Sequence, residues 1–327
     1  MDKPEIISLK AVTHRYKINL KHGKKELKAL DSITAQIPKG VITGYVGLNG
    51  AGKTTTIKIL AGILRNTSGE VIVNNSSPFT NRIAFTKQMG IMFGQINQLL
   101  GTLTLADNFE LIRRIYDINK KDYNERIEYF LNLLHLTDKK MTPARYLSFG
   151  QSVKANLIIS VLHNPALLLL DEPTIGVDVV SKDNINAFLR QINADFKTSI
   201  LITSHDIYNI EKLVTHILLI DKGKLLFNGA VDVFKTTYKT RNKITVEFNT
   251  EDVTGKIQNE IAACFTGMQV SELCFNGNVC SFFIPSQVNA LDFVCKINAI
   301  ATLKNILVTE QNLEETIKRA VMEESNQ

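Results

Sequence analysis

No stretch of this sequence is long and apolar enough to cross a bilayer. A membrane-spanning helix needs about 20 consecutive apolar residues, and the richest run, 157–170, is interrupted by two polar residues and a proline at 163–165. The N-terminus also lacks a basic region that leads into an apolar segment with a small-residue cleavage site. We therefore expect neither a membrane span nor a secretion signal.

Cysteine and proline are both scarce. The four cysteines all lie in the last quarter of the chain, without a CxxC pair or histidines at metal-ligand spacing, which favours reduced thiols over a disulfide or a metal site. With 44% hydrophobic residues, 21% charged residues and seven prolines, the composition is that of a globular protein. The 327 residues exceed the ~250–300 at which a single core stops growing, so we expect two folding units.

The positive charge of the chain is modest. A net charge of +6 and a pI near 9.0 would permit binding to nucleic acid or to an anionic membrane. The one local concentration of basic residues, 17–28, is interleaved with other residue types around Gly23 and is typical of a hairpin loop. We expect a mildly basic soluble protein with no nucleic-acid partner.

The first 228 residues alternate short β-branched runs with amphipathic helical runs, which is typical of an α/β domain with a largely parallel, buried sheet. Strands are expected at 41–46, 90–93, 167–170, 198–203, 217–220 and 224–227, and helices from Lys53 and at 108–118, 124–136 and 151–162. We expect an ATP-binding domain at 1–230, with a helical subdomain at about 96–165.

The pattern changes after a junction rich in Lys and Thr at 235–243. Strands are expected at 244–248, 268–275, 279–284 and 306–309, and helices at 255–265, 288–300 and 313–322. Apart from the last helix, this is a βαββαβ order, which predicts a small α+β, ferredoxin-like accessory domain at 231–327. Internal repeats are absent, so the chain carries one copy of its first domain.

A phosphate-binding loop is expected between the first predicted strand and helix. The residues Gly47, Leu48, Asn49, Gly50, Ala51, Gly52, Lys53 and Thr54 match the G-x-x-x-x-G-K-[ST] pattern in the required context. Glycines let the backbone wrap around phosphates, and the helix from Lys53 turns the positive end of its dipole towards them. Lys53 would neutralise the β- and γ-phosphates, Thr54 would hold Mg²⁺, and Thr55 would add an ATP contact. The predicted ligands are therefore ATP and Mg²⁺.

Two carboxylates follow the buried strand 167–170, at the edge where ligands sit in open α/β sheets. Asp171 would hold Mg²⁺, directly or through water, and Glu172 would orient and deprotonate the attacking water. Acidic residues at a strand end are weak evidence on their own. Downstream of a phosphate loop, they indicate ATP hydrolysis.

Further segments resemble the ATP-binding cassette (ABC) ATPases. The run Leu147–Gln151, Leu-Ser-Phe-Gly-Gln, resembles the Leu-Ser-Gly-Gly-Gln signature of that family, with Phe149 in place of its first glycine. Gln95 looks like the Q loop, His205 like the switch histidine, and 175–178, Ile-Gly-Val-Asp, like the D loop. The resemblance covers roughly residues 5–230 and implies a phosphate-loop ATPase fold.

The resemblance also implies a role for Tyr16. This residue stands where the family stacks an aromatic ring on adenine, although a core tyrosine at a strand end is the alternative. Gln95 would contact Mg²⁺ and sense the γ-phosphate, and His205 would hydrogen-bond that phosphate and hold the water in line. The catalytic set implied is Glu172, His205, Gln95 and Lys53.

The signature implies that two subunits share each ATP. Ser148, Gly150 and Gln151, with Asp178 of the D loop, would contact the ATP bound to a second, facing subunit. The expected helix at 151–162 supplies the physical reason, because its dipole favours an anion at its start. One chain thus holds two half-sites and must pair with a second ATP-binding subunit. We expect a homodimer, and a heterodimer stays open as the alternative.

Two segments and the appended domain resemble ATPase subunits of ABC-2-type transport systems, which are commonly exporters. These segments are 95–100 and 174–180. The resemblance implies a peripheral protein at the cytoplasmic face of the cell membrane that powers a separate multispanning permease. Two interpretations of the apolar residues after the Q loop stay open: a groove that docks the permease, or the core of the helical subdomain. These residues are Leu99, Leu100, Leu103 and Leu105.

Two other classes are less well supported. A soluble ABC ATPase that acts on ribosomes or DNA would be expected to carry two cassettes or an inserted coiled coil, and the sequence has neither. A catalytically dead scaffold is disfavoured because the residues Lys53, Asp171, Glu172 and His205 are all present.

Overall fold

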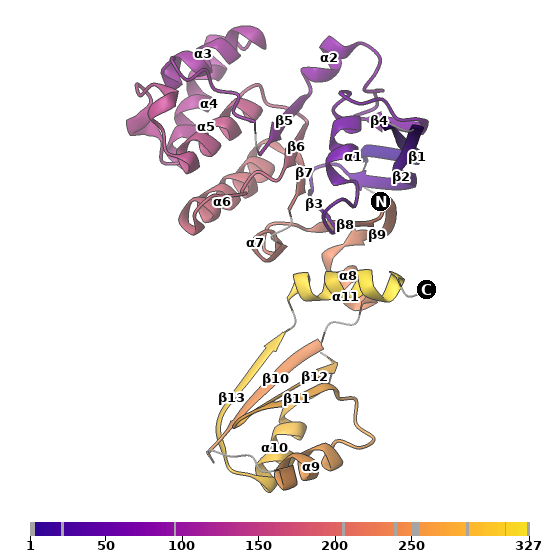
Figure 1. The fold of residues 1–327 in the computed structure, drawn as a ribbon. Coiled ribbons are helices and arrows are strands. Elements are labelled where there is room, and N and C mark those ends of the chain that lie inside the picture. Colours follow the sequence, from indigo (N-terminus) through magenta and orange to yellow (C-terminus); the bar gives the residue numbers. More distant parts are fainter. Residues whose placement is uncertain are drawn as a thin grey trace. The chain divides into compact units, whose positions relative to one another are not determined.

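The computed structural model describes residues 4–20, 23–94, 96–204, 207–238, 241–249, 255–285, 288–310 and 312–325 (Figure 1). Its internal contacts divide the chain into two compact units, Met1–Val231 and Asp232–Gln327. Among the described residues, no helix has the length and apolar character that crossing a membrane would require.

A largely parallel sheet forms the centre of unit 1. Its strand order is β5-β6-β7-β3-β8-β9, in which only the β8–β9 pair is antiparallel. The bounds are β3 Ile42–Val46, β5 Met89–Phe93, β6 Leu167–Asp171, β7 Ser199–Thr203, β8 His216–Asp221 and β9 Lys224–Ala230. The strands β3, β6 and β7 are buried throughout, which explains their continuous apolar sequence. The expected α/β architecture is confirmed.

A second, antiparallel sheet of order β2-β1-β4 was not anticipated from the sequence. It consists of β1 Glu5–Leu20, β2 Gly23–Pro38 and β4 Ser68–Val73. The expected hairpin near Gly23 is confirmed, since Lys17 lies opposite Glu26 and Leu20 opposite Gly23 in the β1–β2 pair. The expected extent of its loop is wrong, because most of 17–28 is paired strand. Strand pairing satisfies the backbone groups there, which the interleaved lysines did not reveal.

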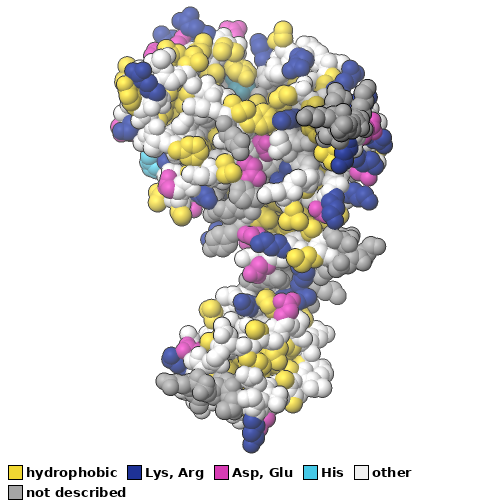
Figure 2. All heavy atoms as spheres, viewed as in Figure 1, with side chains coloured by type: hydrophobic (Ala, Val, Ile, Leu, Met, Phe, Trp, Pro, Cys, Tyr) yellow, Lys and Arg dark blue, Asp and Glu magenta, His cyan; other side chains and the backbone are white. Residues whose placement is uncertain are grey.

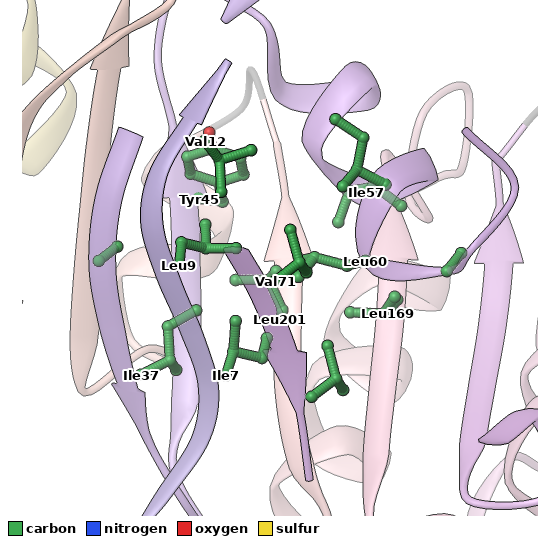
Figure 3. Close-up of a cluster of buried hydrophobic side chains, with 14 of the residues drawn as sticks. Ile7, Leu9, Val12, Ile37, Tyr45, Ile57, Leu60, Val71, Leu169 and Leu201 are labelled. Atoms are coloured by element: carbon green, nitrogen blue, oxygen red, sulfur yellow. The ribbon is translucent and has the colours of Figure 1, made fainter. Parts of the chain in front are cut away.

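The core of unit 1 lies between the two sheets, and α1 Lys53–Leu60 packs into it. Figure 3 shows Ile7 and Leu9 of β1 facing Leu169 and Leu201 of the parallel sheet, with Ile57 of α1 beside them. This packing fixes the start of α1 relative to the strand ends, and so positions the phosphate-binding loop.

Helices make up the second lobe of unit 1 (Figure 1). They are α3 Leu105–Ile115, α4 Lys120–Leu133, α5 Phe149–Val161 and α6 Val179–Phe196, with two 3-10 turns at Thr137–Lys139 and Ala144–Tyr146. Two short helices lie outside this lobe: α2 Arg82–Thr86, whose Phe85 belongs to the core between the two sheets, and α7 Ile207–Glu211, which follows β7. Helix α3 begins three residues before its expected start at 108. Thr104 and Asp107 form a reciprocal capping box there, which satisfies the first N–H groups of the helix.

His163 connects this lobe with strand β5 of the parallel sheet. Its ring stacks on Tyr116 at 3.9 Å between centroids, and its Nε2 lies 3.1 Å from the carbonyl oxygen of Met89 in β5. Burial lowers the pKa of His163 from 6.5 to about 4. The folded state therefore favours the neutral ring. Between pH 6.5 and about pH 4, the His163 ring binds more protons in the unfolded state than in the folded state.

Stability should fall as the pH drops from 6.5 towards 4. For His163 alone we expect a loss of about 2 kcal/mol between pH 7 and pH 5. Urea unfolding at both pH values should show this loss in the native chain and a smaller loss in His163→Gln. The titration of carboxylates contributes equally to both proteins, so it cancels when the two losses of stability are compared. An equal loss in both proteins would contradict the assignment.

Unit 2 contains an antiparallel sheet of order β11-β12-β10-β13. Its elements are β10 Arg241–Phe248, α9 Gly255–Cys264, β11 Ser271–Asn276, β12 Val279–Pro285, α10 Ala290–Ile300 and β13 Leu303–Glu310, with α8 Val231–Thr237 before them and α11 Leu313–Ser325 after them. Along β10, Ile244, Val246 and Phe248 are buried against α9 and α10, while the residues between them are partly exposed. One face of the sheet is thus covered by helices.

Candidate functional site

The phosphate-binding loop follows β3 and is packed against neighbouring backbone at two glycines. A Cβ on Gly47 would lie 2.1 Å from the carbonyl oxygen of Ile220, and one on Gly52 would lie 2.7 Å from that of Ala29. Gly52 also has φ +112°, a conformation that favours glycine. Any side chain at these two positions would displace the loop, so its shape depends on both glycines.

Lys53 folds back over this loop. Its Nζ donates hydrogen bonds to the carbonyl oxygens of Gly47 at 2.8 Å and Leu48 at 3.1 Å. Burial lowers the pKa of Lys53, and the charges of Glu172 and Asp171 oppose this shift. The ammonium group is therefore held over the loop and within electrostatic reach of both carboxylates.

The first turn of α1 is arranged for an anion. In the part of the chain that the structure describes, no side chain caps this helix and no acidic residue lies in its first turn. The first N–H groups of a helix have no intrahelical partner, so a phosphate can accept their hydrogen bonds. Thr54 lies in this turn and is exposed, as a hydroxyl ligand for a phosphate-bound cation must be.

Asp171 and Glu172 lie at the carboxyl ends of the parallel strands, as predicted. Thr203, at the end of β7, donates a hydrogen bond from Oγ1 to Asp171 Oδ1 at 2.7 Å and accepts one from the backbone N–H of Glu172 at 3.0 Å. Glu172 adopts a left-handed φ of +55°. Sequence reasoning missed Thr203, because its role arises only from the pairing of β6 with β7.

The predicted Gln95 and His205 lie outside the described residues. The strands that precede them, β5 and β7, flank β6 on its two sides. The backbone N–H of Gly94 donates to the carbonyl oxygen of Asp171 at 2.8 Å, and a Cβ on Gly94 would lie 2.1 Å from the Glu172 carbonyl oxygen. The backbone at Gly94, directly before position 95, is therefore in contact with the backbone of the acidic pair.

Tyr16 lies beside the first turn of α1. Its hydroxyl is 3.2 Å from Oγ1 of Thr55, and its half-buried ring meets the ring of His14 edge-on, with 4.6 Å between centroids. The fold thus brings the tyrosine proposed for adenine stacking to the same end of α1 as the phosphate-binding loop.

The signature run and the D loop lie against each other. Ser148 caps α5: its Oγ accepts from the N–H of Gln151 at 3.3 Å, and Gln151 Oε1 accepts from the N–H of Ser148 at 3.0 Å. The expected helix start at 151 is therefore wrong, and α5 begins at Phe149, because this capping box stabilises the extra turn. A Cβ on Gly150 would lie 3.3 Å from Oδ2 of Asp178.

Asp178 in turn caps α6 by accepting from the N–H of Ser181 at 2.9 Å, and this bond lowers the pKa of the carboxyl. Lys154 of α5 is buried, and Asp178 opposes the lowering of its pKa by burial. Phe149 is 55% exposed, and its ring lies 3.4 Å from where a Cβ on Gly176 would be. Phe149 thus contacts the D loop of its own chain.

Two buried asparagines position the segment after Gln95. Asn156 of α5 accepts from the N–H of Gln98 at 2.8 Å and donates to Asn97 Oδ1 at 2.9 Å. Asn108 of α3 accepts from the N–H of Leu100 at 2.8 Å. Sequence reasoning missed both, although an amide on the apolar face of a helix was a signal that could have identified them.

The loop, the acidic pair and the signature can be compared with those of known proteins. A family model described as "ABC transporter" matches residues 30–175. The bacitracin transport ATP-binding protein BcrA of Bacillus licheniformis is 31% identical over 225 residues, which cover 69% of this chain and 71% of BcrA. This chain belongs to the ABC transporter family. Its first unit is an ABC ATPase domain, and such domains hydrolyse ATP to drive transport.

Another relative of this ABC ATPase has a name that states a direction of transport. The methionine import ATP-binding protein MetN of Carboxydothermus hydrogenoformans is 30% identical over 249 residues, 74% of this chain and 72% of that protein. A solved dimeric ATP-binding cassette bound to ADP and Pi has a TM-score of 0.60 at 24% identity and covers 69% of this chain and 98% of its own. The fold is therefore that of the phosphate-loop ABC ATPases.

Proposed function

We propose that this chain hydrolyses Mg-ATP with Glu172 as the base that deprotonates the attacking water. Lys53 and the first turn of α1 bind the phosphates, Thr54, Asp171 and Gln95 hold Mg²⁺, His205 orients the water, and Tyr16 stacks on adenine. The observation that carries this proposal is the Thr203 hydroxyl, which bonds Asp171 and Glu172 at the strand ends next to the phosphate-binding loop. Thr203 thus fixes the Asp171 carboxylate and the Glu172 backbone, and two neighbouring carboxylates at this place can serve one metal ion and one water molecule.

A second copy would complete each ATP site. In this proposal Ser148, Gly150 and Gln151, with Asp178, contact the γ-phosphate side of the partner's ATP. Figure 1 supports a division of labour, because α1 and α5 lie in different lobes of unit 1. At the start of α5 the Ser148 hydroxyl already accepts from the N–H of Gln151, so in this proposal the N–H groups of Phe149 and Gly150 and the positive end of the helix dipole would face the anion.

We propose further that the motor drives a multispanning permease of the ABC-2 type, for export, from the cytoplasmic face of the cell membrane. The segments 95–100 and 174–180 and the appended unit 2 support this assignment. We assign unit 2 to the ferredoxin-like folds, because its βαββαβ order is joined to the antiparallel strand order β13-β10-β12-β11. Import is the alternative direction, favoured by one MetN match that extends over 291 residues, 88% of the chain.

The leucines after the Q loop have different environments. Leu99 and Leu105 are 6% and 0% exposed, so for them the core interpretation is correct and the groove interpretation is wrong. Leu100 is 50% exposed, and Leu103 is half-buried. Figure 2 shows apolar side chains on the surface of this lobe. We therefore place permease docking at Leu100 and the exposed residues near it.

Leu100→Asp should leave the fold and the ATPase activity intact and abolish co-purification with the permease. Leu105→Asp is the contrasting variant, because a charge at a fully buried position should unfold the lobe. Circular dichroism and phosphate release would be measured beside the co-purification. Normal co-purification of Leu100→Asp would exclude this residue from the docking surface.

The proposed function as a whole is tested by a pull-down from solubilised membranes. Glu172→Gln with ATP serves as bait, because this variant should remain in the ATP-bound closed dimer. A multispanning membrane protein among the captured proteins would support the transporter assignment and identify the subunit that determines the substrate. Capture of ribosomes or nucleic acid without a membrane protein would overturn it.

A further inference from the structure

The edge strand β13 exposes apolar residues beside unpaired backbone. In the described part of the chain its one neighbour in the sheet is β10, and Ile306, Leu307 and Val308 are 41%, 57% and 45% exposed. Single exposed apolar residues are ordinary on protein surfaces. Three in a row on a free strand edge form a template for pairing with another strand.

The opposite edge of the sheet is protected. Strand β11 has a register shift between Ser271 and Cys274, Glu272 within it has φ +56°, and the Glu272 carboxylate pairs with Arg241 at 3.0 Å. A bulge and a charge are two of the features by which proteins block edge pairing. Strand β13 has neither over 305–309, where its register with β10 is regular. Its own register shift lies at Lys304, and its two charged residues, Lys304 and Glu310, stand at the ends of this segment. The two edges therefore differ in their capacity to accept a strand.

The backbone of β13 presents alternate residues to the free edge. The N–H of Phe248 in β10 bonds Asn278, just ahead of β12, at 2.9 Å. The backbone N–H and C=O groups of even-numbered β10 residues thus point towards β12, and those of odd-numbered residues point towards β13. Residues 305, 307 and 309 of β13 lie opposite odd-numbered β10 residues, so their backbone N–H and C=O groups point towards β10. The backbone groups of the even-numbered β13 residues then point towards the free edge. In agreement, the N–H of Ile306 does not point to β10 and bonds the Oδ1 of Asn305 at 2.9 Å.

We infer that β13 pairs antiparallel with β13 of a second copy of this chain, about a two-fold axis at Leu307. Residues 304, 306, 308 and 310 would exchange backbone hydrogen bonds, and the two Leu307 side chains would meet in a non-hydrogen-bonded pair, where side chains approach closely. The sequence is self-complementary in this register. The facing pairs are Lys304 with Glu310, Asn305 with Thr309, and Ile306 with Val308.

Neighbouring registers lose this match. A two-fold axis at Ile306 would place Lys304 opposite Val308, and an axis at Val308 would place Glu310 opposite Ile306. Each arrangement sets a charge against an apolar side chain, which is unfavourable. The axis at Leu307 also keeps all three exposed apolar residues of both copies within the new contact.

The pairing requires small local changes. Asn305 must release the N–H of Ile306, and Lys304, whose ammonium lies 2.7 Å from Glu247, would in addition stand opposite residue 310 of the other copy. The contact would keep two ATPase units together between cycles of ATP hydrolysis, at an effective concentration of about millimolar. This consequence rests on the proposed function, and the strand pairing itself does not.

Sedimentation of the full nucleotide-free chain tests the pairing. We expect a dimer, at least about tenfold weaker self-association in Leu307→Lys, and recovery of the dimer when Leu307→Lys is mixed with Leu307→Glu, because like charges directly opposite each other repel and unlike charges attract. Asn305→Ala is the matched control and should remain dimeric. Retained ATP binding by Leu307→Lys would show that unit 1 is folded.

Cross-linking tests the register. In a chain carrying Cys274→Ser and Cys295→Ser, which removes the two exposed thiols, Leu307→Cys should form a disulfide between copies under mild oxidation. Thr309→Cys should not, because it would face Asn305. A monomeric parent chain at about 100 µM, a dimer unaffected by Leu307→Lys, or equal cross-linking at both positions would each overturn the proposal. An inactive ATPase that still pairs in this way would contradict the proposed function alone.

Discussion

Glu172→Gln should reduce ATP turnover by about two to four orders of magnitude while leaving ATP binding nearly unchanged, because a positioned general base contributes about 10²–10⁴ to the rate. Gln has the same shape as Glu and cannot accept the proton of the attacking water. The backbone N–H of residue 172, which bonds Thr203 at 3.0 Å, is unaffected by the exchange. With turnover blocked, the ATP-bound closed dimer should accumulate.

Phosphate release and binding of a fluorescent ATP analogue measure the two effects separately. Glu125→Gln, which makes the same exchange at an exposed position on α4, is the matched control and should keep normal turnover. If Glu172→Gln hydrolysed ATP at the native rate, the assignment of Glu172 as the base would be wrong.

Lys53→Ala should weaken ATP binding by about 100-fold or more. Hydrogen bonds to charged groups contribute about 1.5–3 kcal/mol each, and loss of about 3 kcal/mol corresponds to roughly two orders of magnitude in affinity. Lys53 is buried and already lies over the loop, with Nζ on the carbonyl oxygens of Gly47 and Leu48. The site therefore loses a preorganised cation, and ATP-dependent closure of the dimer should be lost with it.

Isothermal titration with ATP and the ATP-dependent change in sedimentation would measure binding and closure. Lys53→Met separates charge from packing, because its side chain fills the buried space left by Lys53 without an ammonium group. Both variants should lose binding, and nucleotide-free pairing through β13 should persist. ATP affinity near the native value in Lys53→Met would show that the charge of Lys53 is not needed for binding.

Most elements could be placed from the sequence because their signals are local. The glycines and Lys53 of the phosphate-binding loop lie within eight residues, and the period of apolar residues located the parallel strands and several helices. The 18-residue helix α6 was not among those expected. The acidic pair was found because a buried strand ends directly before it. Unit 2 was outlined by the same local patterns.

The exposure of individual residues in an apolar segment could not be predicted in this way. Leu99, Leu100 and Leu105 are equivalent in hydrophobicity, yet Leu100 is half exposed and the other two are buried. Their burial depends on how 97–100 is held by Asn156 and Asn108 from two different helices. The β1–β2–β4 sheet was missed for a related reason, since β1 pairs with β4 across roughly 60 residues of chain.

The sequence by itself determined the chemistry of this protein: a phosphate-binding loop, two carboxylates and a signature run, each specified by residues that are neighbours in the chain. Only the tertiary structure decided what surrounds them. It brought Thr203 between Asp171 and Glu172, set Phe149 on the D loop, and left β13 at an open sheet edge. Such contacts join strands and helices distant in sequence, and packing and strand pairing determine which of them form.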